Sequence, residues 1–169
     1  MKIKYLLLLF LMLPFISACD RSDNVMGIFT GKTWKLTYIT RSGSNKPAPY
    51  DFWDNATTYK EALKEMNKEG AYTLIFSGEE TDDTAKGTFS GKLYALDYKG
   101  NWSADGKSNE FHASNVTGGT KALLDSYFIE GIKNATRYSG NYDNLYLYYT
   151  YKDKSNKEIE LCLVFHVEK

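Results

Sequence analysis

The chain has 169 residues, enough for one domain of ordinary size and too few for two. Its 21 basic residues balance 21 acidic ones, and this zero net charge excludes the concentrated positive surface on which nucleic-acid binding depends. Hydrophobic residues make up 43%, which indicates a folded chain. The chain holds 14 tyrosines but only two histidines and two cysteines. Because tyrosine favours strands, we expect a β-rich fold. Two histidines leave little material for a metal cluster, so we expect no metal centre and no cofactor.

The first eighteen residues are organised as an export signal. Lys2 and Lys4 precede an apolar run over residues 5–15, which is too short to span a bilayer as a helix. The next four residues, Ile16-Ser17-Ala18-Cys19, resemble a bacterial lipobox, in which the cysteine becomes the diacylated first residue of the mature chain. Lipidation of Cys19 predicts a bacterial cell-envelope lipoprotein whose partner is the lipid bilayer, held in the outer membrane and facing the periplasm or the cell surface. The alternative is an ordinary signal peptide followed by a chance cysteine.

The segment after the export signal is polar and then rich in small residues. This composition predicts a lipidated tether over residues 19–30 and a single domain over residues 31–169. If Cys19 carries lipid, Cys162 has no partner for an internal disulfide. Cys162 lies in an apolar strand pattern, so we expect a buried, inert thiol rather than a nucleophile.

The first half of the domain predicts one strand, one loop and one helix. Apolar and polar residues alternate over residues 32–40, as in a strand, and the aromatic-rich segment 41–56 contains Gly43, Pro47 and Pro49, as in a loop. Thr58 and Glu61 form a capping-box pattern for a helix over residues 58–69. Gly70 is suited to the left-handed conformation that ends a helix.

The second half predicts mainly short strands. Thr120 is a candidate cap for a helix over residues 120–133, although residues 127–129 also fit a strand. An acidic turn is expected at residues 78–83. The expected strands are 72–76, 87–91, 93–98, 100–103, 110–113, 145–151 and 159–167. The regular spacing of turns indicates a mainly β (α+β) domain, an antiparallel meander or barrel of about eight strands with one or two covering helices.

Three stretches of the chain resemble the META domain of HslJ-type exported proteins, and Gly31 and Trp34 resemble the Gly…Trp opening that this domain shares with lipocalin-like barrels. The matching residues are Tyr72-Thr73-Leu74-Ile75-Phe76 with Gly87-Thr88-Phe89-Ser90-Gly91, then Asp125, Phe128, Ile132 and Tyr138, then Asn144-Leu145-Tyr146-Leu147. The Cys-Asn pair that follows the hairpin in the family is absent, and residues 41–70 look like an insertion. The resemblance implies a lipocalin/META-like barrel in a lipoprotein of the kind found in gut Bacteroidetes. It implies no activity, because fold alone does not define a site.

Signatures of catalysis and of metal binding are almost absent. The chain lacks the G-x-S-x-G, P-loop, H-E-x-x-H and C-x-x-C motifs. His112 and His166 lie 54 residues apart on separate strand patterns, which disfavours a joint metal site. The acidic residues 79–83 lack the ligand spacing of an EF-hand loop, so a solvated turn is favoured over a Ca²⁺ site.

Aromatic residues carry the functional hint. Tyr50, Phe52 and Trp53 lie within four residues of one another, and such side chains either stack on a ligand or pack beneath the helix against Tyr59 and Leu63. We therefore predict a ligand-binding surface at these three residues. A second group of tyrosines accompanies the late hairpin: Tyr138, Tyr142, Tyr146 and Tyr148. Asp83-Thr84-Ala85 resembles a Bacteroidetes O-glycosylation site, which makes Thr84 a candidate for modification.

The sequence as a whole favours a non-catalytic binding or interaction module of the cell envelope. Its ligand is expected to be a small molecule, a glycan or an envelope protein. The alternative is a small glycan-active hydrolase, which needs two carboxylates about 5 Å or about 6.5–9.5 Å apart. Asp51 and Asp54 beside the aromatic loop are the candidates for such a pair.

Overall fold

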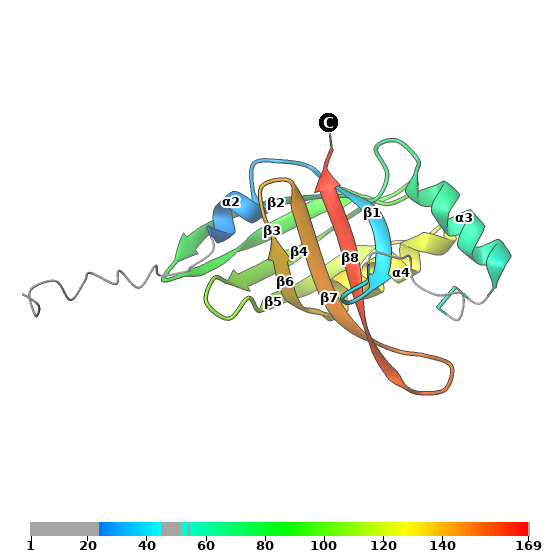
Figure 1. The fold of residues 1–169 in the computed structure, drawn as a ribbon. Coiled ribbons are helices and arrows are strands. Elements are labelled where there is room, and N and C mark those ends of the chain that lie inside the picture. The colour runs from blue at the N-terminus through cyan, green and yellow to red at the C-terminus, as the bar shows by residue number, and fades with distance from the viewer. Residues whose placement is uncertain (1–23, 45–51, 54, 169) are drawn as a thin grey trace, which may run out of the picture.

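The computed structural model describes residues 24–44, 52–53 and 55–168 (Figure 1). Eight antiparallel strands form one sheet in the order β5-β4-β3-β2-β1-β8-β7-β6, which confirms the predicted antiparallel meander. The elements are α2 (Val25–Phe29), β1 (Trp34–Arg41), α3 (Ala56–Met66), β2 (Thr73–Thr81), β3 (Thr84–Lys92), β4 (Asp97–Asp105), β5 (Phe111–Gly118), α4 (Leu123–Asn134), β6 (Ala135–Gly140), β7 (Asn144–Lys152) and β8 (Glu158–Val167).

The sheet folds back on itself without closing into a barrel. Strands β2–β5 form one half, and β6, β7, β8 and β1 form the half that crosses in front of it in Figure 1. The two halves are joined between β1 and β2 by only two described residue pairs, Trp34↔Leu74 and Lys35↔Thr73. In the described chain the edge strands β5 and β6 meet at a single bridge, Glu110↔Arg137. The barrel expected from the META resemblance is therefore not formed.

Alternation along the strands determines which side chains face the space between the halves. In β7, Leu145 and Leu147 are buried, whereas Tyr146 between them is half-buried on the outer side. In β8, Leu163 and Phe165 are fully buried in the same way. Successive side chains of a strand point to opposite faces, so one face of each half forms the core and the other faces outward.

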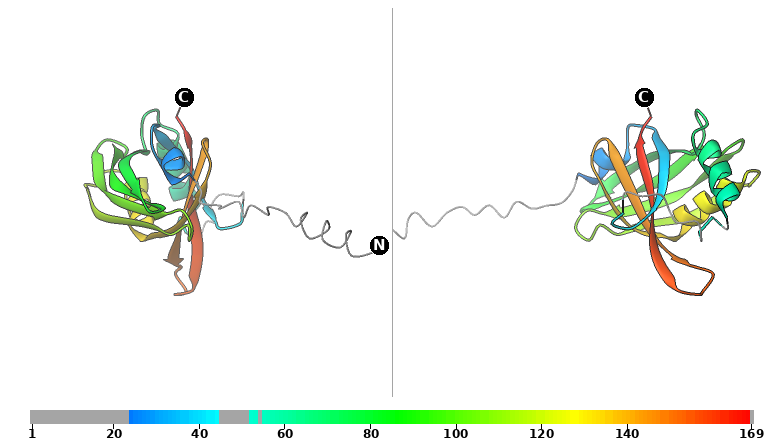
Figure 2. Two further views of the ribbon diagram at one scale, coloured as in Figure 1. Left: turned by 90° about the vertical axis from the view of Figure 1, so that its left-hand side faces the viewer. Right: turned by 45° about the vertical axis from the view of Figure 1, so that its right-hand side comes forward.

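The helix α2 corrects the predicted extent of the tether. Val25 and Phe29 have no exposed surface, and the Phe29 ring stacks on Trp102 at a centroid distance of 4.8 Å. Figure 2 shows α2 at one end of the two halves, with α3 and α4 at the other end. Val25, Ile28 and Phe29 are spaced as one face of a helical turn. The folded domain therefore begins by Val25 rather than at Gly31.

The helix α3 is present, but its ends differ from the prediction. Its N-cap is Asn55, whose side chain accepts hydrogen bonds from the amides of Thr57 and Thr58 at 2.9 and 3.0 Å. The predicted cap at Thr58 is therefore wrong by three residues. Gly70 adopts the left-handed conformation (φ 65°) as expected, although the helix ends earlier, at Met66.

The remaining differences concern turns, the start of α4, whose N-cap is Ala122 rather than Thr120, and the alternative reading of residues 127–129. These three residues are helical within α4. Strand β2 continues through Thr81, so the predicted acidic turn shrinks to Asp82 and Asp83, both at positive φ. Aspartate tolerates this conformation, which two-residue hairpins require. Residues 93–96 form a turn rather than the start of a strand, with the Leu93 amide donating to the Leu96 carbonyl.

Candidate functional site

The space between the two sheet halves is filled by aromatic side chains. Phe29, Phe76, Trp102 and Phe111 contact one another at ring-centroid distances between 4.8 and 6.3 Å. Rings at these distances leave no room for a ligand between them. Among the described residues, open hollows lie instead on the outer surface of the sheet.

The predicted aromatic site at residues 50–53 is buried where the structure describes it. Trp53 is 1% exposed and Phe52 is 2% exposed. Phe52 contacts the rings of Trp53, Tyr127 and Tyr151 at centroid distances of 4.6, 4.9 and 5.0 Å, and Trp53 lies 6.1 Å from Tyr59. Both side chains thus pack beneath the helices, as in the structural alternative, and neither presents a ring to a ligand. Tyr50 lies outside the described residues.

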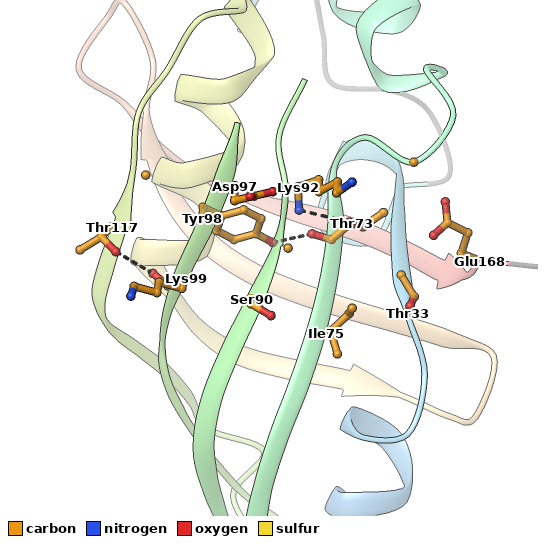
Figure 3. Close-up of a pocket in the computed structure, with 13 residues that line it drawn as sticks. Thr33, Thr73, Ile75, Ser90, Lys92, Asp97, Tyr98, Lys99, Thr117 and Glu168 are labelled. Carbon is orange, nitrogen blue, oxygen red and sulfur yellow. Dashed lines mark hydrogen bonds between the residues drawn. The ribbon is translucent and has the colours of Figure 1, made fainter. Parts of the chain in front are cut away.

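A groove of about 790 Å³ crosses the outer face of β2–β5 and reaches the opening between β1 and β2 (Figure 3). Its floor follows the strand register, because Ile75 pairs with Ser90, Ser90 with Lys99 and Lys99 with Thr117. Thr33 and Glu168 line the end nearest β1. We call this the outer groove.

Charged side chains of both signs line the outer groove. Lys92 and Asp97 are direct cross-strand neighbours, and Lys99 lies two residues beyond Asp97 on β4. Within the described part of the chain, no ion pair occupies the ammonium group of Lys92 or Lys99. Ile75 is 41% exposed and adds an apolar surface to the floor. The outer groove thus offers two ammonium groups, Lys92 and Lys99, and two carboxylates, Asp97 and Glu168, around a floor of hydroxyls and one aliphatic side chain.

Tyr98 lines the outer groove without offering a free hydroxyl. Its hydroxyl donates to the Thr73 carbonyl at 2.8 Å, and burial raises the pKa of Tyr98. The close approach of β2 at this point depends on Gly91, because a Cβ atom there would lie 1.9 Å from the same Thr73 carbonyl oxygen. Gly91 and Tyr98 therefore shape the floor, and the groove's charged contacts come from the lysines and from Asp97.

A second hollow, of about 420 Å³, lies on the outer face of β1, β8 and β7. Its side walls are Tyr38, Tyr146 and Tyr148, and Cys162 and Val164 lie between them. We call this the tyrosine slot. The two other tyrosines of the late hairpin lie elsewhere, since Tyr138 is buried in the core and Tyr142 is 64% exposed at the β6–β7 turn.

The polar and reactive residues noted in the sequence are dispersed. Burial raises the pKa of Cys162 to about 12, so its thiol is protonated and unreactive near neutral pH. Nδ1 of His166 lies 3.0 Å from the Thr37 hydroxyl, and His112 is on β5 in the other half of the sheet. Among the described residues, no three His, Cys, Asp or Glu side chains are grouped so that they could hold a metal ion.

The other candidates of the sequence analysis divide between described and undescribed residues. Thr84 is half-buried at the start of β3, next to Asp83, which pairs with Lys107 at 2.7 Å. Its glycosylation stays a prediction. Cys19, Asp51 and Asp54 lie outside the described residues. No described helix combines the length and the apolar character needed to cross a membrane.

No local pattern in the sequence indicates the outer groove as a unit. Lys92 and Lys99 were unremarkable lysines in two strand patterns, and their proximity depends on the pairing of β3 with β4. Tyr38 lies 108 residues before Tyr146 and joins it only through the pairing of β8 with both neighbours. Outward alternation of Tyr146 and Tyr148 along one strand was the available signal for the tyrosine slot.

The described residues define a mainly β fold of one sheet, with a filled core and open hollows on the outer faces of the sheet. The chain belongs to the DUF4847 family, a domain of unknown function, whose model matches residues 20–167. It is similar to the crystal structure of a DUF4847 family protein from Bacteroides vulgatus ATCC 8482, at 23% identity and a TM-score of 0.55. The match covers 82% of this chain and 96% of that one.

The likeness to the Bacteroides vulgatus protein concerns the fold alone. No curated protein matches the chain at a significant level. Neither finding identifies the chain as a META or HslJ protein, so that resemblance is limited to its mainly β character.

Proposed function

We propose that the chain is a non-catalytic binding module of the bacterial cell envelope, anchored by lipid on Cys19 and binding its ligand in the outer groove. The anchor is supported by the lipobox-like residues 16–19. Only residues 20–24 separate Cys19 from the first residue of α2. At about 3.5 Å per residue, such a connection holds the domain within roughly 20 Å of the bilayer surface.

The outer groove is the observation that carries the proposed binding role. Its volume of about 790 Å³ lies within the range typical of small-molecule sites. Lys92 and Lys99 lie on the same face of the sheet as Ser90 and the exposed Ile75 side chain, as their register requires (Figure 3). Ammonium groups that are not occupied by ion pairs attract an acidic group, and hydroxyls accept or donate hydrogen bonds to polar groups.

The ligand that fits this arrangement is elongated and polar, with an acidic group at the lysines and hydroxyls near Asp97 and Glu168. The floor spans four strands from Ile75 to Thr117, which corresponds to about 14 Å at the usual spacing between strands. Two or three sugar residues cover such a distance. An oligosaccharide that carries an acidic unit for the two lysines therefore matches the length and the cationic part of the outer groove better than a compact neutral metabolite.

The anchor is tested by expressing the full chain and its Cys19→Ser variant in a Gram-negative bacterium. Mass spectrometry of the mature N-terminus is expected to find acyl chains on Cys19, and the protein is expected in the outer-membrane fraction. The variant should lose both properties. An unmodified, soluble wild-type protein with a cleaved N-terminus would contradict the anchor, and the binding role would still be open to the next test.

Binding is tested by isothermal titration calorimetry on residues 20–169, which contain every described element. The probes are an oligogalacturonate and a neutral galactose oligomer of equal length. We expect the acidic oligomer to bind more tightly, and the double variant Lys92→Met/Lys99→Met to remove that preference. Lys86→Met, on the same face but outside the outer groove, is the matched control. Equal binding of both oligomers, or equal loss in the control, would contradict the proposal.

A further inference from the structure

The tyrosine slot has its geometry set by strand pairing. Val164 of β8 pairs with Tyr38 of β1 on one side and with Tyr146 of β7 on the other. Two strand spacings therefore separate the side-chain origins of these tyrosines, about 10 Å. Cys162 similarly pairs with Thr40 and Tyr148. The slot is thus a hollow between two walls of rings, with Val164 and Cys162 as its floor.

Contacts with Arg137 and Ser139 hold one ring of the slot, that of Tyr148, in place. The guanidinium of Arg137 lies 3.8 Å from the centre of the Tyr148 ring, and both of its contacts with the Glu160 carboxylate are 3.0 Å long. The Tyr148 hydroxyl lies 3.0 Å from the Ser139 hydroxyl. A ring fixed on one face and at its hydroxyl loses little freedom when a ligand covers its other side.

The slot is electrically neutral as well as aromatic. The charge of Arg137 is balanced by the Glu160 carboxylate. A hydrogen bond from Ser42, followed by the contact with Arg137, lowers the pKa of Glu160. Tyr38 is 49% exposed, whereas Val164 and Cys162 are buried beneath the walls. Polar groups lie at the rim, including the imidazole of His166. An uncharged ligand with one apolar face and polar edges matches these surroundings.

We propose that the tyrosine slot binds a neutral saccharide, whose C–H face stacks on Tyr38 and Tyr146 while its hydroxyls meet the polar rim. This site goes beyond the proposed function, because its strands β1, β7 and β8 belong to the other half of the sheet from β2–β5 (Figure 1). No lysine or arginine is among the described residues that line it. The small hollow of about 420 Å³ fits one or two sugar rings. A protein partner would need a far larger contact area than the slot offers.

The test uses residues 20–169 and neutral hexasaccharides of glucose, mannose and N-acetylglucosamine, with binding measured by calorimetry. We expect at least one probe to bind, and Tyr38→Ala and Tyr146→Ala each to weaken it about tenfold, as loss of a stacked ring should. Tyr38→Phe and Tyr146→Phe keep the ring and are expected to retain most of the affinity. Tyr142→Ala removes an exposed tyrosine outside the slot and should have no effect.

Three outcomes would overturn the proposal. Failure of all three probes to bind is one, and an equal loss in Tyr142→Ala is another. The third is self-association of the wild type that Tyr38→Ala abolishes, because the slot would then be an interface between copies of the chain. Lys92→Met/Lys99→Met should leave binding of the neutral probe intact, so failure in the slot and failure in the outer groove are distinguishable.

Discussion

The hydroxyl of Tyr72 donates a 3.0 Å hydrogen bond to Oδ1 of Asp125, and this contact joins the start of β2 to the first turn of α4. Asp125 is fully buried and also accepts hydrogen bonds from the amides of Tyr94, Lys121 and Ala122. Burial and the nearby carboxylates raise the pKa of Tyr72. The carboxylate at the N-terminal end of α4 thus ties three separate segments together.

Removal of the Tyr72 hydroxyl is predicted to destabilise the domain. Tyr72→Phe deprives a buried carboxylate of one donor, and a hydrogen bond to a charged group contributes about 1.5–3 kcal/mol. The free energy of unfolding, measured by urea denaturation, should fall by that amount. Tyr94→Phe keeps the backbone contact with Asp125 and is the control. An unchanged midpoint in Tyr72→Phe would show that the contact is not stabilising.

The buried position of Trp53 predicts a large effect of its truncation. Trp53→Ala removes a ring packed against Phe52 and Tyr127, so the free energy of unfolding should fall by about 3–5 kcal/mol. Tyr142→Ala, at an exposed aromatic residue, should change it by less than about 0.5 kcal/mol. A small effect of Trp53→Ala on the melting curve would instead favour the ligand-binding role predicted from the sequence.

Lys35 is predicted to stabilise the end of α3. Its ammonium donates to the carbonyls of Met66, Lys68 and Ala71. Met66 is the last residue of α3 and the other two follow it, so these carbonyls have no partner within the helix. Lys35→Met should lower the free energy of unfolding by about 1.5–3 kcal/mol. Lys60→Met on the exposed surface of α3 should be nearly neutral. Equal denaturation midpoints for the two variants would contradict this role.

Cys162 is predicted to be unreactive in the folded protein. Because burial raises its pKa to about 12, residues 20–169 should resist a thiol reagent at pH 8 and react fully in guanidinium. The raised pKa also means that the contribution of Cys162 to the free energy of unfolding is constant while the unfolded thiol is protonated. Stability should then fall as pH rises above the ordinary thiol range, because only the unfolded state ionises there. Rapid labelling of the native protein would refute the burial.

Most strands could be predicted from the sequence, because the alternation of apolar and polar residues is a local pattern. Leu145 and Leu147, or Leu163 and Phe165, define a core face without knowledge of the partner strand. The helix α2 was missed because five residues after a polar stretch give too short a pattern. Its burial comes from contact of Phe29 with Trp102, a residue far along the chain. For Phe52 and Trp53, the sequence could not decide between stacking on a ligand and packing in the core, because their ring contacts Tyr127 and Tyr151 also lie far along the chain.

The candidate sites were harder to predict than the strands, because each depends on register. Lys99 lies opposite Ser90 because the turn between β3 and β4 sets their alignment. Tyr38 faces Tyr146 because β8 lies between β1 and β7, although β8 is the last strand of the chain. A shift of one residue in either pairing would move these side chains to the core face. Strand register of this kind depends on the tertiary structure and cannot be predicted from a local sequence pattern.

Chemical-shift mapping tests the central claim, ligand binding in the outer groove, most directly. Residues 20–169 labelled with ¹⁵N would be titrated with the oligogalacturonate at low and at high salt. We predict that amide shifts cluster at Ser90, Lys99 and Thr117 and that they shrink with salt because the charges are exposed. In Lys92→Met/Lys99→Met they should fall to the size seen with the neutral oligomer. An absence of shifts, or a cluster on β1, β7 and β8 with none on β2–β5, would contradict the proposed role of the outer groove.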